Sequence, residues 1–407
     1  MQKQRTARLR KICRKKGELP PMFPSKRGGH PGNVSRMAYN RSNSDNKNTR
    51  GRCTPADLRM GIFAEKTEKK PPRPITKEEQ HANNISMVEM GEIIGSFLKW
   101  NSIYVSELRE MNRNKVGRPW EFADSLIAAI LSLMVFRNDT FRAVVGFVRP
   151  LFETIGIKVP SPSRLLERAN ELAGRNAVKP DAELKERYGD RVLALFVNGN
   201  IGNRVRRCGI DSTGISMSSV NMWKKKKHGV GTKDRGWLKI HALSDVDTGE
   251  IIAYAITDES VGDGPMLKVL VNLAVEKGHL FDTVYADNAY ESIENWECVC
   301  RTHNMKFVTS FRRDTPPKNK GSSERGEATR LWCSLPYRKW VEVTGYGVRW
   351  KCECVFSDLK RIFPENVNSV TDEGIIRNLS VRVQLFNGYK AIRAENIGVT
   401  GNGIVIG

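Results

Sequence analysis

The 407-residue sequence has no long apolar run, few cysteines and too few acidic residues to balance its basic ones. Its longest uncharged apolar run, residues 125–136, is far shorter than the roughly 20 residues that span a membrane, and residues 1–20 lack the apolar stretch of a secretion signal. The closest of its eight cysteines form C-x-C pairs rather than the C-x2-C pairs of structural zinc sites. We therefore expect a cytoplasmic protein with reduced thiols, no membrane contact and no structural zinc.

Basic residues dominate instead: 67 lysines and arginines stand against 45 aspartates and glutamates, a formal net charge of +22. Residues 1–75 contain 20 of these basic residues and 5 of the acidic ones. This excess indicates a polyanionic partner such as DNA and argues against a purely small-molecule enzyme. Residues 1–78 also have few large apolar side chains and no sustained period. We therefore expect a mostly disordered basic arm, which is either a solvated tail or a source of sequence-independent phosphate contacts.

The pattern of residues 79–185 predicts a small all-α module. Apolar residues recur at three- and four-residue steps over residues 84–112, which indicates an amphipathic helix. Three short helices are expected after it, over residues 122–136, over residues 141–152 with Asp139 as the N-cap, and from Ser161 and Pro162 onward.

Short helices with polar turns favour a helix-turn-helix-like unit that binds DNA ends, although three helices are also a common packing unit. Four arginines of this module are candidates for DNA contact: Arg142, Arg149, Arg164 and Arg168. The alternative is that they only form a charged outer face of the module.

Strands and helices alternate over residues 204–395. Five strands are expected, over residues 208–216, 237–244, 250–257, 281–286 and 305–311, the second and third forming a hairpin. Helices are expected over residues 265–277, 292–303 and 346–363, with a polar loop over residues 312–330. This order predicts a mixed α/β sheet with flanking helices, in which ligands gather at the carboxyl ends of strands.

Acidic side chains occur within or at the ends of the predicted strands, where ligands are expected. Asp211 interrupts the first strand and Asp287 closes the fourth, so the two carboxylates face each other if these strands are neighbours. An acid at a strand end also commonly serves as a turn residue or helix cap. The last predicted helix adds four residues at spacings of 3, 4 and 7, which share one face of the helix: Tyr346, Arg349, Glu353 and Lys360. The plainer interpretation of this spacing is a surface ion pair between Arg349 and Glu353.

The Tyr-x2-Arg-x3-Glu-x6-Lys spacing at residues 346–360, downstream of both aspartates, resembles the signature of the insertion-sequence DDE transposases. Further similarity lies in Gly117-Arg118-Pro119, Lys239-x-His241, Asp247-Thr248-Gly249-Glu250 and Val261-Gly262-Asp263. The resemblance implies a ribonuclease-H-like catalytic fold with a five-stranded mixed sheet. It also implies that Asp211, Asp287 and Glu353 are the catalytic triad.

Three carboxylates acting on a phosphodiester require divalent cations, because bare acids would repel DNA. We expect Mg²⁺, with Mn²⁺ as a substitute, held by Asp211 as the bridging ligand and by Asp287 and Glu353 on either side. Arg349 and Lys360 are expected to bind transposon-end phosphates. Tyr346 either contacts the DNA end or packs beneath the helix.

Lys224, Lys225, Lys226 and Lys227 are further candidates for DNA-backbone contact, with a solvated loop as the alternative. The expected activity is cleavage of insertion-sequence ends and transfer of the 3′-OH ends to target DNA. The expected partners are double-stranded terminal inverted repeats, target DNA and a second copy in a synaptic complex, at the nucleoid of a prokaryote. The alternatives are a transposase-derived DNA-binding protein that does not cleave, and a nuclease of the same fold that stops after hydrolysis.

Overall fold

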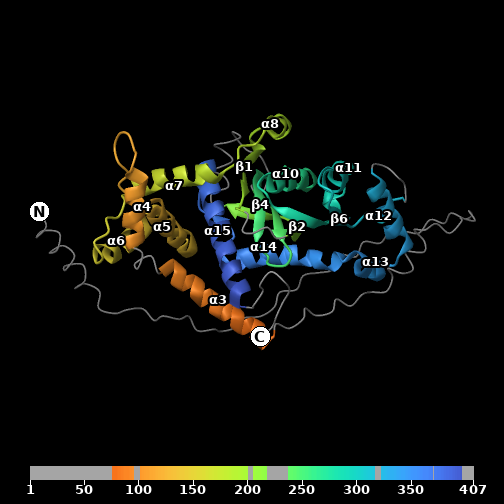
Figure 1. The fold of residues 1–407 in the computed structure, drawn as a ribbon, viewed down its shortest axis with the longest axis horizontal. Helices are drawn as coiled ribbons and strands as arrows, with labels where there is room; N and C mark the ends of the chain where they lie inside the picture. The colour runs from red at the N-terminus through yellow and green to blue at the C-terminus, as the bar shows by residue number, and fades with distance from the viewer. Residues whose placement is uncertain are drawn as a thin grey trace, which may run out of the picture. The chain divides into compact units, whose positions relative to one another are not determined.

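The computed structural model describes residues 76–95, 101–199, 205–217, 237–316, 322–369 and 371–396 (Figure 1). The predicted basic arm lies outside these residues except for its last three positions. The lysine run at residues 224–227 also lies outside them. Within the described ranges, no helix has the length and apolarity needed to cross a membrane.

The helical module contains more helices than the sequence pattern indicates. Its elements are α3 (Lys77–Gly95), α4 (Asn101–Asn112), α5 (Asp124–Arg137), α6 (Phe141–Glu153), α7 (Pro162–Asn176) and α8 (Ala182–Tyr188). The three predicted short helices are present as α5, α6 and α7. Residues 84–112, expected as one helix, contribute to both α3 and α4.

The N-cap of α6 differs from the prediction. Thr140, not Asp139, caps this helix, because its hydroxyl accepts a hydrogen bond from the amide of Ala143 at 3.2 Å. Asp139 instead pairs with Arg137 at 2.7 Å. Both residue types are good caps, so only the position where the backbone becomes helical decides between them. Ser161 caps α7 as expected, with Pro162 in its first turn.

A mixed sheet forms the second part of the chain. Its strands are β1 (Val192–Val197), β2 (Val205–Met217), β3 (Trp237–Asp245), β4 (Ile251–Asp258), β5 (Leu280–Ala286), β6 (Lys306–Thr309) and β7 (Asn366–Val367). The strand order is β1-β4-β3-β2-β5-β6, with β7 beside β2. The pairs β2/β3, β3/β4 and β1/β4 are antiparallel, whereas β2/β5, β5/β6 and β2/β7 are parallel.

The five expected strands are β2 to β6, and their order is that of a ribonuclease-H-like sheet, as predicted. An antiparallel meander of three strands is followed by two strands that each return parallel beside the first. The structure adds β1 at the outer edge of β4 and the two-residue β7 beside the end of β2, giving seven strands rather than five. The apolar run of β1 was visible in the sequence, but β7 is too short to leave a sequence pattern.

Helices cover both faces of the sheet. They are α10 (Asp263–Glu276), α11 (Ile293–Trp296), α12 (Ser323–Ser334), α13 (Tyr337–Thr344), α14 (Trp350–Ile362) and α15 (Asp372–Asn396). A π-helical turn, Glu297–Thr302, continues α11. Together the two account for the helix predicted over residues 292–303. The predicted loop at residues 312–330 is wrong in its second half, because α12 begins at Ser323. Only every third residue of its middle part, namely Gly326, Thr329 and Trp332, is buried, so its apolar signal is weak.

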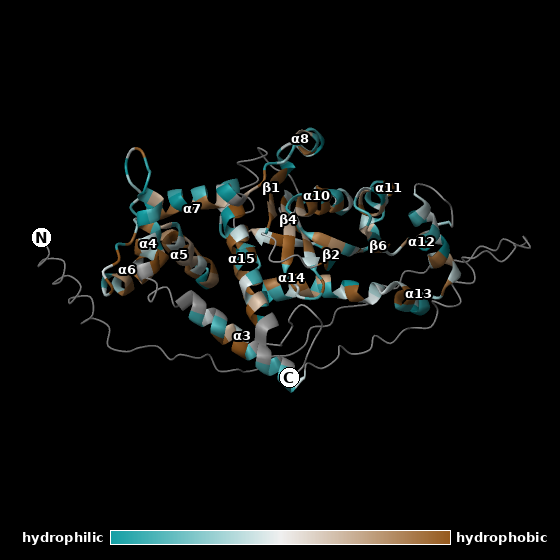
Figure 2. Cartoon of the chain, in the orientation of Figure 1, coloured by the Kyte–Doolittle hydropathy of each residue, from teal (hydrophilic) through white to brown (hydrophobic). Residues whose placement is uncertain are grey.

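Two apolar clusters lie on opposite faces of the sheet. Alternation along β2 divides them: Cys208 and Ile210 belong to one cluster, with the apolar side of α10, and Ile215 and Met217 belong to the other, with α14. The strands are correspondingly apolar beneath the helices (Figure 2). The second cluster continues into the helical module, since α15 contacts α3, α5 and α7 as well as β1 and β4.

Candidate active site

The pairing of β2 with β5 brings two of the predicted acids to one place in the sheet. Gly209 of β2 lies opposite Tyr285 of β5 in a parallel register. Asp211 and Asp287 each follow two residues later along neighbouring strands, so both stand at the same end of this strand pair. The neighbourhood that the sequence could only assume is therefore present.

Asp287 also acts as a helix cap. Its carboxylate accepts a hydrogen bond from the amide of Ala289 at 2.9 Å and so caps a 3₁₀ turn, Asn288–Tyr290. Its carbonyl accepts a hydrogen bond from the hydroxyl of Thr309 on β6 at 2.7 Å. These contacts hold the backbone at Asp287 while one of its carboxylate oxygens stays outside the cap.

A close approach of α14 to β2 places the third acid. A Cβ atom on Gly209 would lie 2.0 Å from the sulfur of Cys352, so only glycine at this position lets the helix pack at its present distance. Glu353 follows Cys352 directly and is largely exposed, with a side-chain exposure of 58%. The spacing of the sheet and helix therefore determines how far Glu353 stands from Asp211.

The electrostatics of Asp211 link the three acids. Burial raises its pKa to about 6; the Ser212 amide, 2.8 Å from its carboxylate, and the Arg349 guanidinium oppose this rise, and the negative charges of Asp287 and Glu353 add to it. The charges of Asp287 and Glu353 therefore both act on Asp211. Within the described part of the chain, however, no three His, Cys, Asp or Glu side chains lie close enough together to hold a metal ion.

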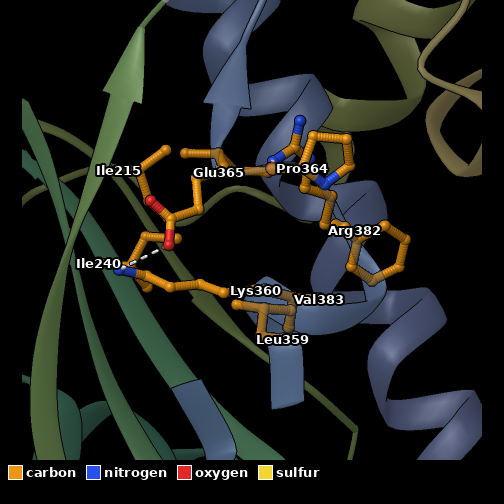
Figure 3. A pocket seen from close by; sticks show the side chains of 10 residues that line it. Ile215, Ile240, Leu359, Lys360, Pro364, Glu365, Arg382 and Val383 are labelled. Carbon is orange, nitrogen blue, oxygen red and sulfur yellow. Dashed lines mark hydrogen bonds and ion pairs between the residues drawn. The ribbon is translucent and has the colours of Figure 1, made fainter. Parts of the chain in front are cut away.

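The signature residues do not all lie on one helix. Tyr346 and Arg349 belong to a 3₁₀ turn, Tyr346–Arg349, that precedes α14, and Glu353 and Lys360 lie on α14 itself. Arg349 pairs with Glu353 at 2.5 Å, so the ion pair that is the plainer interpretation of their spacing is present. Lys360 lies 3.8 Å from Glu365 beside a small cavity (Figure 3).

Tyr346 is buried, which favours the packing alternative for this residue. Its ring lies 4.9 Å from that of Trp340, and its hydroxyl is 3.1 Å from that of Ser310. The Arg349 guanidinium lies 5.8 Å from the Tyr346 ring centre, so the tyrosine supports the arginine.

A polar network behind Asp211 was missed by sequence reasoning. Asp263, in the first turn of α10, accepts hydrogen bonds from the Ser212 hydroxyl and the Lys239 ammonium, both at 2.8 Å. His241 is fully buried and lies 3.5 Å from the same carboxylate oxygen. Three of these residues stand in motifs that resemble the transposases, which was the available signal. The network ties the residue after Asp211 to β3 and α10.

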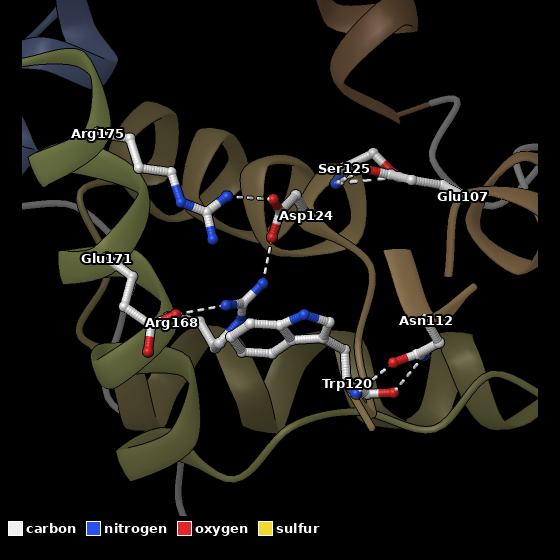
Figure 4. Close-up of polar contacts among 8 residues, drawn as sticks. All are labelled: Glu107, Asn112, Trp120, Asp124, Ser125, Arg168, Glu171 and Arg175. Atoms are coloured by element: carbon white, nitrogen blue, oxygen red, sulfur yellow. Dashed lines mark hydrogen bonds and ion pairs between the residues drawn. The ribbon is translucent and has the colours of Figure 1, made fainter. Parts of the chain in front are cut away.

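The four arginines predicted to contact DNA differ in how far their side chains are buried. Arg142 and Arg149 are exposed on α6, whereas Arg164 is half-buried and pairs with Glu167 at 2.8 Å. Arg168 lies inside the module with 1% exposure (Figure 4).

The partners of Arg168 account for its position. It pairs with Asp124 and Glu171, and its guanidinium stacks on the Trp120 ring at 4.0 Å. Asp124 also pairs with Arg175 at 2.5 Å. A buried guanidinium with two carboxylate partners holds α5 and α7 together, so in this arrangement Arg168 does not reach DNA.

Comparison with known proteins adds a family match for the part of the chain that contains these acids. Residues 206–381, which include all three acids, match the family model described as the transposase DDE domain. The solved structures that resemble the chain include the Drosophila P element transposase strand transfer complex, with 11% identity over 52% of this chain and 46% of that one and a TM-score of 0.29. The piggyBac transposase synaptic complex with hairpin DNA has 11% identity over 80% and 77% of the two chains and a TM-score of 0.29.

A third similar structure is the simian T-cell lymphotropic virus intasome in complex with PP2A regulatory subunit B56 gamma, with 13% identity over 53% and 66% of the two chains and a TM-score of 0.19. This chain thus spans less than half of the P element transposase chain. The assignment rests on the family match and on the sheet order that agrees with it. The similarity to DDE transposases therefore lies in residues 206–381, less than half of the chain, which match the transposase DDE domain.

Proposed function

We propose that this protein is a DNA transposase that cleaves the ends of an insertion sequence and transfers the resulting 3′-OH ends to target DNA. The observation that carries the proposal is the position of Asp211 and Asp287 at one end of the β2/β5 pair, inside the matched DDE domain, with Glu353 on the helix packed against β2. The catalytic triad and the Tyr-Arg-Glu-Lys signature remain proposals that this placement supports.

DDE transposases generally use divalent metal ions. The carboxylates are chemically suited to such ions, and they would have to move closer together than in this arrangement to share one. Carboxylate oxygens are the ligands that Mg²⁺ prefers, and the raised pKa of Asp211 reflects burial and neighbouring negative charge that a divalent cation would neutralise. Asp211, Asp287 and Glu353 would hold Mg²⁺, or Mn²⁺ in its place. When bound, the ions would supply activation of the attacking oxygen and stabilisation of the leaving oxygen.

The chain's own residues orient the DNA. Arg349 and Lys360, on successive parts of one helical segment, would bind phosphates on either side of Glu353 as charge-assisted donors. The Asp263 network would hold the backbone at Ser212 and so the carboxylate of Asp211. In the first reaction a water oxygen attacks phosphorus and the 3′ oxygen of the element leaves as a 3′-OH. That hydroxyl then attacks a phosphodiester of the target, and the target's 3′ oxygen leaves.

Other parts of the chain would bind the ends. The exposed Arg142 and Arg149, with Arg164 beside them, make α6 and α7 the candidate surface for terminal inverted repeats. Residues 224–227 would add backbone contacts. Joining two ends requires a synaptic complex, for which we propose a homodimer, and we propose the prokaryotic nucleoid as the site of action.

The test is cleavage and strand transfer on duplex DNA that carries the sequences flanking this coding region, in Mg²⁺. Asp211→Asn and Glu353→Gln should each lower both activities by about a thousandfold or more while end binding persists, because each removes a charged oxygen ligand. Glu276→Gln on α10, an exposed acid outside the site, is the control and should be as active as wild type.

Three outcomes would change the proposal. Full activity in the Asp211 or Glu353 variant would refute the triad. Tight end binding without cleavage by the wild type would favour a transposase-derived DNA-binding protein, and cleavage without joining would favour a nuclease.

A further inference from the structure

Arg349 is a cation that pairs with Glu353, one of the proposed acids of the site. Its guanidinium donates to a carboxylate oxygen of Glu353 at 2.5 Å, and its charge also acts on Asp211. The arginine side chain is only 20% exposed, whereas Glu353 is 58% exposed. The arginine is therefore held within the site by the Tyr346 ring, and the glutamate reaches to it from the more open side.

This arrangement balances charge in the absence of metal. Asp287 and Glu353 each repel Asp211, and Arg349 attracts both Asp211 and Glu353 and so offsets part of that repulsion. A divalent ion that uses the same Glu353 oxygen needs the position in which the guanidinium now donates. Two cations cannot share one carboxylate oxygen at contact distance without mutual repulsion.

We propose that Arg349 is the resident counter-cation of this acidic site, and that a divalent ion competes with its guanidinium for the Glu353 carboxylate. The inference rests on the proposed function, because it takes Glu353 as a metal ligand. It gives Arg349 a role before DNA arrives: the arginine keeps the acids together in the metal-free protein and sets the affinity for metal.

Lys360 provides a matched comparison. It carries the same charge on the same helix, but it pairs with Glu365 rather than with an acid of the site. It lies seven residues beyond Glu353, about 10 Å along the helix, a distance at which the interaction of exposed charges is largely screened at physiological salt.

The test measures Mn²⁺ binding to the full-length protein without DNA, by electron paramagnetic resonance of the free ion at constant ionic strength. Arg349→Gln should bind Mn²⁺ about three- to fivefold more tightly than wild type, the range that an exposed ion pair supplies. Arg349→Lys should bind within about twofold of wild type, because it retains the charge. Lys360→Gln should bind as wild type does.

A stability measurement guards against a variant that folds poorly. Saturating Mn²⁺ should raise the Tm of Arg349→Gln more than that of wild type, because the tighter complex stabilises the folded state more. Equal or weaker Mn²⁺ binding by Arg349→Gln, or an equal gain in Lys360→Gln, would overturn the inference.

Asp211→Asn separates the inference from the proposed function. Mn²⁺ binding that is lost in Asp211→Asn but unchanged in Arg349→Gln refutes the counter-cation alone. Binding that is unchanged in Asp211→Asn refutes the metal site itself, and the inference with it.

Discussion

His241 shows how burial sets the state of one residue. Its side chain is fully buried, with Nε2 3.0 Å from the Thr257 hydroxyl and Nδ1 3.5 Å from Asp263. Burial lowers its pKa to about 4, Asp263 opposes this shift and the nearby Lys239 adds to it. The histidine is therefore neutral in the folded protein near neutral pH, which agrees with a packing role.

This burial makes stability depend on pH. The unfolded histidine takes up a proton below about pH 6.5, whereas the folded one does so only near pH 4, so the unfolded state binds more protons between these values. His241 should therefore lower the free energy of unfolding by about 2 kcal/mol between pH 7 and pH 5, a contribution that the raised pKa of Asp211 opposes. Urea unfolding at pH 7 and pH 5 measures this change, and the free energy of unfolding of His241→Gln should fall by less than that of wild type. An equal fall in both proteins would show that His241 is not the cause.

Arg168 and Arg142 are both arginines of the helical module, but they should respond differently to substitution. Arg168→Ala removes a buried side chain that stacks on Trp120 and pairs with Asp124 and Glu171, so it should lower the free energy of unfolding by about 1–3 kcal/mol. Arg142→Ala should leave stability within about 0.5 kcal/mol and weaken DNA binding, with a shallower salt dependence. Urea unfolding and DNA titrations at several salt concentrations compare them. A stable Arg168→Ala that binds DNA poorly would restore the original interpretation of this residue.

Among the secondary-structure elements, the packing of α14 on β2 has the most direct bearing on the site. Gly209 and Cys352 meet where the helix crosses the strand, one residue from Glu353 and two from Asp211. Nothing in the local sequence of either element indicates this contact, because the two residues are far apart along the chain. The distance between two of the acids is thus a property of the pair of elements.

Gly209→Ala should push α14 away from β2, since its Cβ would overlap the Cys352 sulfur. We expect a loss of about 1–3 kcal/mol in stability and a larger fractional loss of cleavage than of end binding. Adding Cys352→Ala removes the overlapping sulfur and should recover much of the stability and of the cleavage activity. The Cβ atom that remains at position 352 would lie 3.7 Å from a Cβ atom at position 209, which is an ordinary contact distance. Unfolding and cleavage assays on the single and double variants test this. No recovery in the double variant would show that the helix spacing is not the cause.

Over the whole molecule, α15 connects the helical module to the sheet. Its buried residues Ile375, Leu379, Val383 and Phe386 recur at helical spacing and belong to one apolar cluster with residues of α5 and β4. Residues 53–407 accordingly behave as one compact unit by their contacts. The boundary drawn between the helical module and the catalytic domain from the sequence stays a prediction, since the last helix packs on both sides of it.

Phe386→Ala should therefore destabilise both parts together. Removing this fully buried ring should cost about 3–5 kcal/mol. Hydrogen exchange should then show reduced protection in α5 and in β4 alike, because both lose the same cluster. Reduced protection in α5 alone would show that the module unfolds independently of the sheet.

Local patterns were enough to predict much of the fold. Alternation and turn residues gave β2 to β6, and helical spacing gave α5 to α7, α10 and α14, because these signals act over a few residues. They failed at Thr140, where two adjacent caps compete, and at α12, where Gly326 and Thr329 occupy two of the three buried positions. The buried residues of α15 carried a helical period that would have revealed this helix.

The sequence by itself determined which residues can carry the chemistry: the order and spacing of Asp211, Asp287 and Glu353, and the signature around the last of them. Only the tertiary structure decided which elements are neighbours, that Arg168 is buried, that Tyr346 packs, and that Arg349 pairs with Glu353. The physical reason is that burial and charge pairing depend on partners distant along the chain, such as Asp124 for Arg168, and local periodicity carries no information about those partners.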